Sequence, residues 1–327
     1  MATSIKNPHT FFNFQEKGDP RSLRSKIDKL STCFLAIASV SSIFAASSIA
    51  ALLLYNFVKF CEQGFLPNIL SDAWLPSKGK YGFLPFIAGT LWITVVAMTI
   101  SLPLGFLTAI FMAEYIPRKL YSPVKSLIEL LAGIPSVVYG MWGLMILIPL
   151  VRDHLAPLIG GSLGEALPIF RVNVNAGFSV LAAGIVLSIM VLPIMISISE
   201  EVMRAVPMEY REAALALGAT RWQTVKTVTL RQASSGIFAG IILSFCRAFG
   251  ETMAVLMVAG NVATTPSSLF DPAYPLTALI ANHLLEMLST PSYAYALLTA
   301  GFTLFTITFS FNVVARLTIR QLRRARR

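Results

Sequence analysis

Long apolar segments alternate with polar connections along the chain, after a polar N-terminal stretch. Each of six segments is longer than the roughly 20 apolar residues that a helix needs to cross a bilayer. They run approximately over residues 33–58, 82–113, 127–150, 176–198, 236–260 and 292–315. The pattern predicts an all-α integral membrane protein with six transmembrane helices. We expect Gly133 and Pro135 to bend the third of them.

The composition agrees with this pattern and gives an orientation. Of 327 residues, 55% are hydrophobic and only 13% are charged, and the mean hydropathy is +0.70. Twenty of the 26 Lys and Arg residues lie in the N-terminal stretch, near 114–126, in the connection 199–235 and at the C-terminal end. Because basic connections stay on the cytoplasmic side, both termini are predicted to be cytoplasmic. Their spread over four segments also argues against a nucleic-acid-binding patch, although the net charge is +10.

These assignments divide the chain into regions. We expect a cytoplasmic N-terminal tail over 1–32 and a first transmembrane helix with an outside loop over 33–79. The first helix is too long for the apolar part of a signal peptide, so it is interpreted as an uncleaved anchor. A five-helix transmembrane core over 80–316 follows, with a cytoplasmic loop at 199–235, and a basic cytoplasmic tail over 317–327 ends the chain.

The residues that usually carry catalysis or bind metal form no pattern. The three cysteines are far apart without a CxxC pair, and no HExxH motif occurs, so the sequence predicts no metal site. It contains no GxxxxGK[ST] motif, so it cannot bind ATP through a phosphate-binding loop of its own. Without a nucleophile-and-base constellation either, the chain is not expected to be an enzyme.

The cytoplasmic loop predicts two short helices around a glycine. Glu209 and Glu212 favour the positive end of a first helix, and Gly218 suits the position just after its end. Thr220 followed by Gln223 is a capping box, so a second helix should start at once. Ala213 and Ala214 leave one face of the first helix nearly bare, which suits close packing against another surface.

This loop resembles the EAA loop of permease subunits of ATP-binding-cassette importers. The motif is carried by Glu212-Ala213-Ala214, by Gly218, and by Val228 and Leu230 at the spacing of its last part. In that family the loop docks on a cytoplasmic ATPase, which assigns ATPase coupling to Glu212, Ala213, Ala214 and Gly218. The closing proline of the motif is Arg231 here, so the second helix is free to continue toward the fifth span.

Three further stretches are similar to the C-type permease of the phosphate-specific transport importer. They are YGFLPFIAGTLWIT (81–94), IELLAGIPSVVYGMWGL (128–144) and RAFGETMAV (247–255). The resemblance implies the type I importer permease (MetI-like) fold and import of inorganic phosphate. It implies a sister permease as a heterodimer partner, two ATPase subunits that carry ATP and Mg, and an extracytoplasmic phosphate-binding protein. No cofactor is expected on this chain itself.

Arg247 and Glu251 are charged residues inside the predicted fifth span. An ionised side chain at the bilayer centre costs about 3 kcal/mol on insertion scales, so each needs a partner or water. Their spacing of four places both on one helix face, where they can pair. One interpretation makes Arg247 a phosphate contact in transit, steadied by Glu251, with Thr252 lining the path. The other makes them a structural ion pair, either within this chain or to the sister subunit.

Other positions in the spans have more than one interpretation. Glu129, near the cytoplasmic end of the third span, is a candidate for a structural or gating contact together with Pro135. Gly236 and Gly240 form a GxxxG pair, which permits close helix packing either within one subunit or between two.

Three rival functions stay open at this point. One is a permease for another oxyanion such as sulfate or molybdate. A second is an ion-coupled secondary carrier, which would tend to show inverted repeats with paired broken helices and would leave the EAA loop unexplained. The third is a structural or signalling membrane protein, which predicts no transport.

Overall fold

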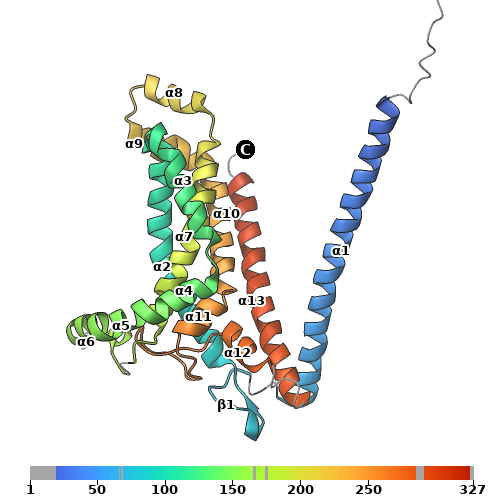
Figure 1. The fold of residues 1–327 in the computed structure, drawn as a ribbon, viewed down its shortest axis with the longest axis vertical. Coiled ribbons are helices and arrows are strands. Elements are labelled where there is room, and N and C mark those ends of the chain that lie inside the picture. Colours follow the sequence, from blue (N-terminus) through green and yellow to red (C-terminus); the bar gives the residue numbers. More distant parts are fainter. Residues whose placement is uncertain are drawn as a thin grey trace, which may run out of the picture. The chain divides into compact units, whose positions relative to one another are not determined.

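The computed structural model describes residues 20–65, 67, 69–164, 167–173, 176–284 and 291–324, and most of these residues are helical (Figure 1). Residues 1–19 and 325–327 of the predicted tails lie outside these ranges. The chain divides after Leu52, within its first helix, into two units. Each unit is described by itself.

Helices of very different lengths and one small antiparallel hairpin make up the described residues. In chain order the elements are α1 Pro20–Glu62, β1 Trp74–Leu75, η2 Pro76–Lys78, β2 Lys80–Tyr81, α2 Leu84–Ile110, η3 Phe111–Tyr115, α3 Arg118–Gly133, α4 Ser136–Trp142, η4 Gly143–Leu147, α5 Ile148–Leu150, η5 Val151–Leu155, α6 Ala156–Leu163, η6 Pro168–Phe170, α7 Val180–Arg204, α8 Met208–Ala216, α9 Arg221–Thr224, η7 Val225–Thr229, α10 Leu230–Phe249, α11 Met253–Val258, α12 Leu276–His283 and α13 Pro291–Arg324. The segments η3, η4, η5 and η7 are π-helical and continue the helices beside them.

Six helical segments among the described residues are long and apolar enough to cross a membrane. They are Lys29–Glu62, Leu84–Tyr115, Ser136–Gly161, Val180–Arg204, Arg221–Phe249 and Pro291–Arg320. The predicted number of spans and the all-α class are therefore confirmed. The predicted bounds of the third and fifth spans are wrong, because each of these stretches contains a helix break.

The first break lies at Ile134 and Pro135. Helix α3 ends at Gly133, and the two residues after it have extended ψ angles of 129° and 141°. A proline donates no backbone N–H and favours an extended conformation in the residue before it, which explains the interruption. Gly133 and Pro135 thus end one helix and start another, where the sequence predicted only a bend.

The second break follows Phe249. Gly250 leaves the helix, and α11 starts only at Met253. Glycine is a poor helix former, and polar contacts hold the residues after it: the Thr277 hydroxyl donates to the Glu251 carbonyl at 2.8 Å. Arg247 therefore lies in the last turn of α10, and not near the middle of one straight helix as predicted.

The first unit consists, among its described residues, of the α1 segment from Pro20 to Leu52. The helix thus begins inside the stretch predicted to be a tail. Its large apolar side chains are exposed, as a segment in contact with lipid requires. The hydroxyls of Ser39, Ser41 and Ser42 donate to helix carbonyls three or four residues earlier. These polar groups are therefore satisfied within the helix, which an apolar surrounding demands.

The core of the second unit is built on α7, which packs along both α2 and α10. Small residues permit the close approach. A Cβ on Gly184 of α7 would lie 2.4 Å from Val96 of α2. The GxxxG glycines of α10 face α7 in the same way: a Cβ on Gly236 would lie 2.3 Å from Val202, and one on Gly240 would lie 3.0 Å from Ile198. The GxxxG pair thus packs within the subunit.

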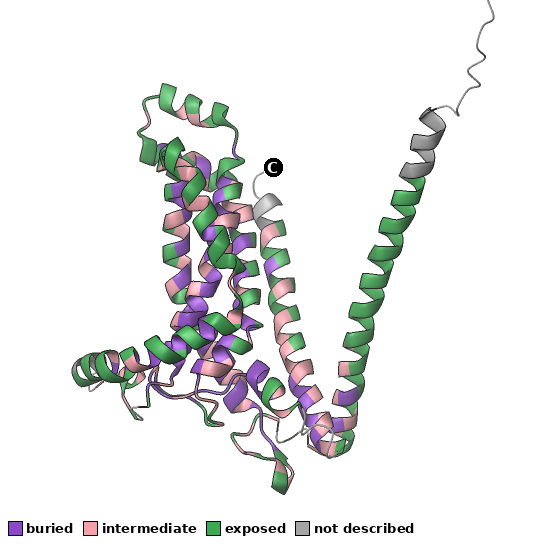
Figure 2. Ribbon diagram, viewed as in Figure 1, coloured by how far each residue is buried: buried purple, intermediate pink, exposed green. Residues whose placement is uncertain are grey.

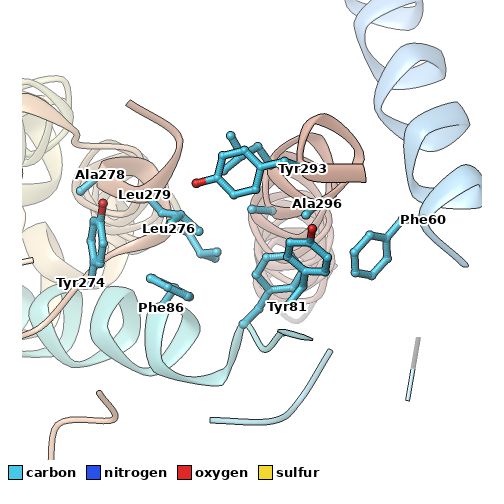
Figure 3. Close-up of a cluster of buried hydrophobic side chains, with 12 residues drawn as sticks. Phe60, Tyr81, Phe86, Tyr274, Leu276, Ala278, Leu279, Tyr293 and Ala296 are labelled. Carbon is cyan, nitrogen blue, oxygen red and sulfur yellow. The ribbon is translucent and has the colours of Figure 1, made fainter. Parts of the chain in front are cut away.

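A cluster of aromatic rings closes one end of this unit. It brings together Phe60 of α1, Tyr81 of β2, Phe86 of α2 and Tyr293 of α13, with Tyr274 just before α12 (Figure 3). The Trp74 ring lies 5.1 Å from the Phe86 ring, edge to face, which is a favourable aromatic geometry. This end carries the hairpin and α12, whereas α8 and α9 lie at the opposite end of the unit (Figure 1).

Candidate functional site

Arg247 and Glu251 lie at the break after α10. Their charged groups approach to 3.6 Å between Arg247 Nη2 and Glu251 Oε2, so the predicted pair forms. The two partners differ in burial: 53% of the Arg247 side chain is exposed, whereas 5% of the Glu251 side chain is. A cation in the last turn of a helix is also favoured by the helix dipole. The guanidinium is thus paired with Glu251 on one side and exposed on the other.

The protein fixes Glu251 from several directions. Its Oε1 accepts from the Ala254 N–H at 3.4 Å, so the carboxylate caps α11. Its carbonyl accepts from Thr277, as described above. Thr252 is half-buried beside it and is the residue that precedes α11. Glu251 is therefore a fixed counter-charge, while Arg247 has room to move.

The two breaks lie at the same level of the bundle. Helix α4 packs on α11: a Cβ on Gly140 would lie 3.2 Å from the Ala254 Cα, and one on Gly143 would lie 2.9 Å from Val258. These pairs make the two helices parallel. One turn earlier, the same register places Pro135 beside the break that holds Glu251. This register places the start of α4 near the break that holds Glu251, one turn before the start of α11.

Glu129 lies one turn before the first break, and it is exposed. It lines a groove of about 590 Å³ together with Gly133, Pro135 and their neighbours Ser126, Leu130 and Ile134. Its carboxylate makes no ion pair with another described residue. The structure therefore places both predicted gating residues, Glu129 and Pro135, on one groove, but no contact joins Glu129 to Arg247.

The loop over residues 199–235 has the predicted two-helix form. Gly218 adopts φ +85°, the left-handed conformation that favours glycine after a helix, and Thr220 and Gln223 form both bonds of the capping box. Through the π-helical segment η7 the second helix continues without a break from Arg221 to Phe249, passing Arg231. The expected continuation of this helix into the fifth span is confirmed.

The first loop helix, α8, is an exposed surface (Figure 2). It buries none of its residues. Glu212 and Ala213 are exposed, and Ala214 is half-buried. Large apolar side chains accompany them, and Leu217 is 89% exposed. An exposed apolar surface of this kind marks an interaction site.

Arg211 is a residue that the sequence analysis used only as one of the basic residues that predict membrane orientation. Its side chain is 11% exposed, and its Nη2 lies 3.0 Å from Oε1 of Glu114, at the end of the second span. The same nitrogen donates to the Met203 carbonyl at 2.7 Å, and its Nε donates to the Thr229 hydroxyl at 3.4 Å. The sequence does contain a signal for these contacts: an arginine lies directly before the Glu-Ala-Ala run, and acidic residues lie at the ends of neighbouring spans.

Glu200 is a second residue that the sequence did not single out. Its side chain is fully buried near the C-terminal end of α7, where it accepts from Lys125 Nζ at 2.9 Å and from the Tyr121 hydroxyl at 3.0 Å. Arg204 lies 3.5 Å away and stacks on the Tyr121 ring. Burial alone lowers the pKa of Lys125, but its hydrogen bonds to Glu200 and Glu201 outweigh burial and raise this pKa. The cluster ties α3 to α7.

On the opposite side, Asp271 organises the connection before α12. Its carboxylate accepts from Asn173 Nδ2 at 2.8 Å, from the Ser267 hydroxyl at 2.8 Å and from the Ser268 N–H at 2.9 Å. Burial alone raises the pKa of Asp271, but these hydrogen bonds outweigh it, so the pKa lies below its ordinary value. The side chain therefore stays ionised and holds this segment to the one near residue 173.

No group of three or more His, Cys, Asp or Glu side chains within the described ranges is placed to hold a metal ion. The structure thus offers two kinds of site: a half-exposed guanidinium beside a helix break, and an exposed, partly apolar surface at one end of the bundle.

These features define a class: a multi-pass helical membrane protein whose sequence contains no phosphate-binding loop for ATP. Its fold has a solved counterpart. The structure titled inward-facing MetNI methionine ABC transporter, in its selenomethionine-soaked crystal form, aligns with a TM-score of 0.51 at 19% identity, over 74% of this chain and 94% of that one. At that identity the likeness shows the fold alone.

Sequence comparison gives the family. Residues 101–324 match the family described as binding-protein-dependent transport system inner membrane component, and the chain belongs to it. Proteins named phosphate transport system permease protein PstC are similar over most of their length. The one from Xylella fastidiosa is 43% identical over 78% of both chains, and the one from Haemophilus influenzae is 36% identical over 79% of this chain and 82% of that one. A probable PstC from Methanocaldococcus jannaschii is 36% identical over 76% and 79%. The chain is a permease subunit and not an enzyme.

Proposed function

We propose that this chain is the transmembrane subunit of an ATP-binding-cassette importer that moves inorganic phosphate into the cytoplasm by alternating access. Its relatives bear the names of phosphate transport permeases. The observation that carries the substrate assignment is Arg247, a half-exposed arginine at a helix break in a chain with few charges inside its spans. A guanidinium offers several N–H donors to the oxygens of an anion such as phosphate.

Arg247 is the phosphate contact in this proposal, and Glu251 is the counter-charge that limits its affinity for the anion. The buried carboxylate holds the guanidinium at the break and offsets part of its attraction for anions, so that phosphate is bound weakly enough to leave. Thr252 lines the same point of the path. The start of α4 adds partial positive charge there, because the first N–H groups of a helix have no partner within it.

Glu129 and Pro135 are assigned to the gate that opens and closes the path. The groove that they line lies one turn from the first break, on the same side of α3 as exposed apolar residues. A helix interrupted at Pro135 can change its direction there with a smaller loss of backbone hydrogen bonds than a continuous helix can. The sister permease covers this groove in the assembled importer.

The movement of the ATPase is passed to this chain through the cytoplasmic loop. In the proposal, Glu212, Ala213, Ala214 and Gly218 dock on a partner ATPase, which holds ATP and Mg. The exposed position of α8 and of Leu217 supports this docking, since such an apolar surface is stabilised by a partner. Two ATPase subunits, a sister permease and an extracytoplasmic phosphate-binding protein complete the complex.

The orientation is part of the proposal. The loop with α8 faces the cytoplasm, and the hairpin end faces outward. The basic residues Arg204, Arg211 and Arg221 near α8 support this direction. With six spans, both termini are then cytoplasmic.

The test is uptake of radiolabelled phosphate by the complete complex in lipid vesicles. We expect accumulation that requires ATP and the phosphate-binding protein. Unlabelled phosphate should compete, whereas sulfate and molybdate at the same concentration should not. Stronger competition by either of these anions would assign the permease to it. Uptake driven by an ion gradient without the ATPases would indicate a secondary carrier, and an assembled complex without any transport would indicate a structural role.

A further inference from the structure

Helix α8 carries the docking surface but is weakly attached to the rest of the chain. It packs against α9 and η7 and buries none of its own residues. Arg211 is its charged side chain that is mostly shielded from solvent, with 11% exposed. The contacts of this one arginine therefore decide how a movement of α8 reaches the spans.

Those contacts join three spans at their cytoplasmic ends. Glu114 ends the second span, Met203 lies in the last turn of the fourth, and Thr229 lies in the cytoplasmic part of the fifth. Met203 and Thr229 are themselves fully buried. A guanidinium suits this place because its N–H groups have a fixed planar arrangement and can hold several partners at once.

The three contacts are of two kinds. Nη2 of Arg211 directs a hydrogen bond to the Met203 carbonyl, so Glu114 Oε1 lies close to the same nitrogen without a directed hydrogen bond of its own. The attraction to Glu114 is therefore mainly that of charge. Both side chains are largely shielded from water, so solvent weakens this attraction less than it weakens that of a fully exposed pair.

We propose that Arg211 is a positioning residue that transmits the movement of α8 to the second, fourth and fifth spans. This inference rests on the proposed function, in which an ATPase moves α8. A rigid guanidinium held by three helix ends moves those ends together with α8. Without it, α8 follows the ATPase while the spans stay behind, and ATP is hydrolysed without transport.

The first measurement is the amount of phosphate taken up per ATP hydrolysed by the assembled complex. For Arg211→Gln we expect the complex to assemble and to hydrolyse ATP, while uptake per ATP falls about fivefold or more, the smaller end of typical coupling effects. The matched control is Arg320→Gln, an exposed arginine at the end of α13 without an ion pair among the described residues. It should keep the wild-type ratio.

A second variant guards against a folding defect. Glu114→Gln removes the charge attraction but keeps the hydrogen bonds of Arg211 to Met203 and Thr229. It should lower the ratio less than Arg211→Gln, and the double variant should be no worse than Arg211→Gln alone. If Arg211→Gln only lowered the yield or melting temperature, and the assembled fraction kept the wild-type ratio, the proposal would be overturned.

A distance measurement is independent of the substrate. Spin labels at Glu209 of α8 and Leu243 of α10, introduced after replacement of the three native cysteines, report whether the two helices move together. In the complex with its ATPases, nucleotide should leave this distance unchanged in the wild-type background and change it in Arg211→Gln. An unchanged distance in both would overturn the inference. A wild-type complex that hydrolyses ATP without phosphate uptake would instead overturn the proposed function.

Discussion

Replacing Arg247 by glutamine separates a transport role from a structural one. More than half of the Arg247 side chain is exposed, and its distance to Glu251 is 3.6 Å. Glu251 is buried, but its cation is half-exposed and lies beyond hydrogen-bond distance, so the pair contributes about 1 kcal/mol to folding. A charge-assisted hydrogen bond to a substrate is worth about 1.5–3 kcal/mol, or about 10- to 150-fold in binding. Arg247→Gln should therefore reduce phosphate uptake by about that factor and leave assembly intact.

The assay is phosphate uptake by vesicles that contain equal amounts of assembled complex, with Arg320→Gln as the control arginine. Glu251→Gln adds a second signature. Without the counter-charge, Arg247 should hold the anion more tightly, so that the half-saturating phosphate concentration and the maximal rate both fall. Wild-type uptake by an assembled Arg247→Gln complex would refute the path role and leave the structural ion pair.

Three further predictions concern packing, pH and docking. Gly184→Ala should lower the free energy of unfolding by about 1–3 kcal/mol, because its Cβ would meet Val96 at 2.4 Å. Gly161→Ala, where no atom lies within 4 Å of the new Cβ, should leave this free energy unchanged. Thermal unfolding in detergent compares the two variants, and equal melting temperatures would contradict the packing described. Because the pKa of Asp271 is lowered in the folded protein, its contribution to stability is complete above the ordinary carboxyl pKa of about 3.9 and is lost as pH falls through the folded value. Asp271→Asn should therefore flatten the acid limb of a melting-temperature profile, and an unchanged limb would show that the carboxylate has no such role. Leu217→Asp should weaken co-purification of the ATPase at least tenfold without lowering the melting temperature, since Leu217 is 89% exposed; full recovery of the ATPase would contradict docking at this position.

Local chemistry made much of the fold predictable. Apolar length alone predicted the number of spans, since a bilayer imposes that length on any helix that crosses it. In the loop over residues 199–235, the sequence signals were complete within a few residues. Gly218 supplies the left-handed turn, and the side chains of Thr220 and Gln223 each accept a hydrogen bond from the backbone N–H of the other residue. The structure therefore reproduces both features.

The helix breaks were harder to predict, because apolar segments can cross a membrane with or without an interruption. Pro135 indicated a disturbance, but whether the helix bends or stops there depends on its neighbours. At Gly250 the decisive contact comes from Thr277, far along the chain, whose hydroxyl fixes the Glu251 carbonyl. No local pattern contains that information.

The ionic contacts at the end of the bundle that carries α8 were missed for the same reason. Lys125 and Glu200 lie on different helices, as do Glu114 and Arg211. Counting basic residues for topology treats all of them as equivalent. Only the packing of α3 and α8 against the ends of the spans distinguishes a buried partner from a solvated one.

The most direct measurement of the central claim is the chemical accessibility of the break beside Arg247. Gly250 is exposed, and a Cβ there would meet only the Cys246 carbonyl at 3.5 Å, so Gly250→Cys fits in a chain whose native cysteines have been replaced. In the assembled complex, a charged water-soluble thiol reagent should modify this cysteine, and phosphate should slow the reaction. Val95→Cys, on the exposed side of α2, is the control for a lipid-facing position and should resist the reagent. If Gly250→Cys also resisted it and reacted only with a reagent dissolved in the lipid, the break would face the membrane, and the phosphate path described here would be wrong.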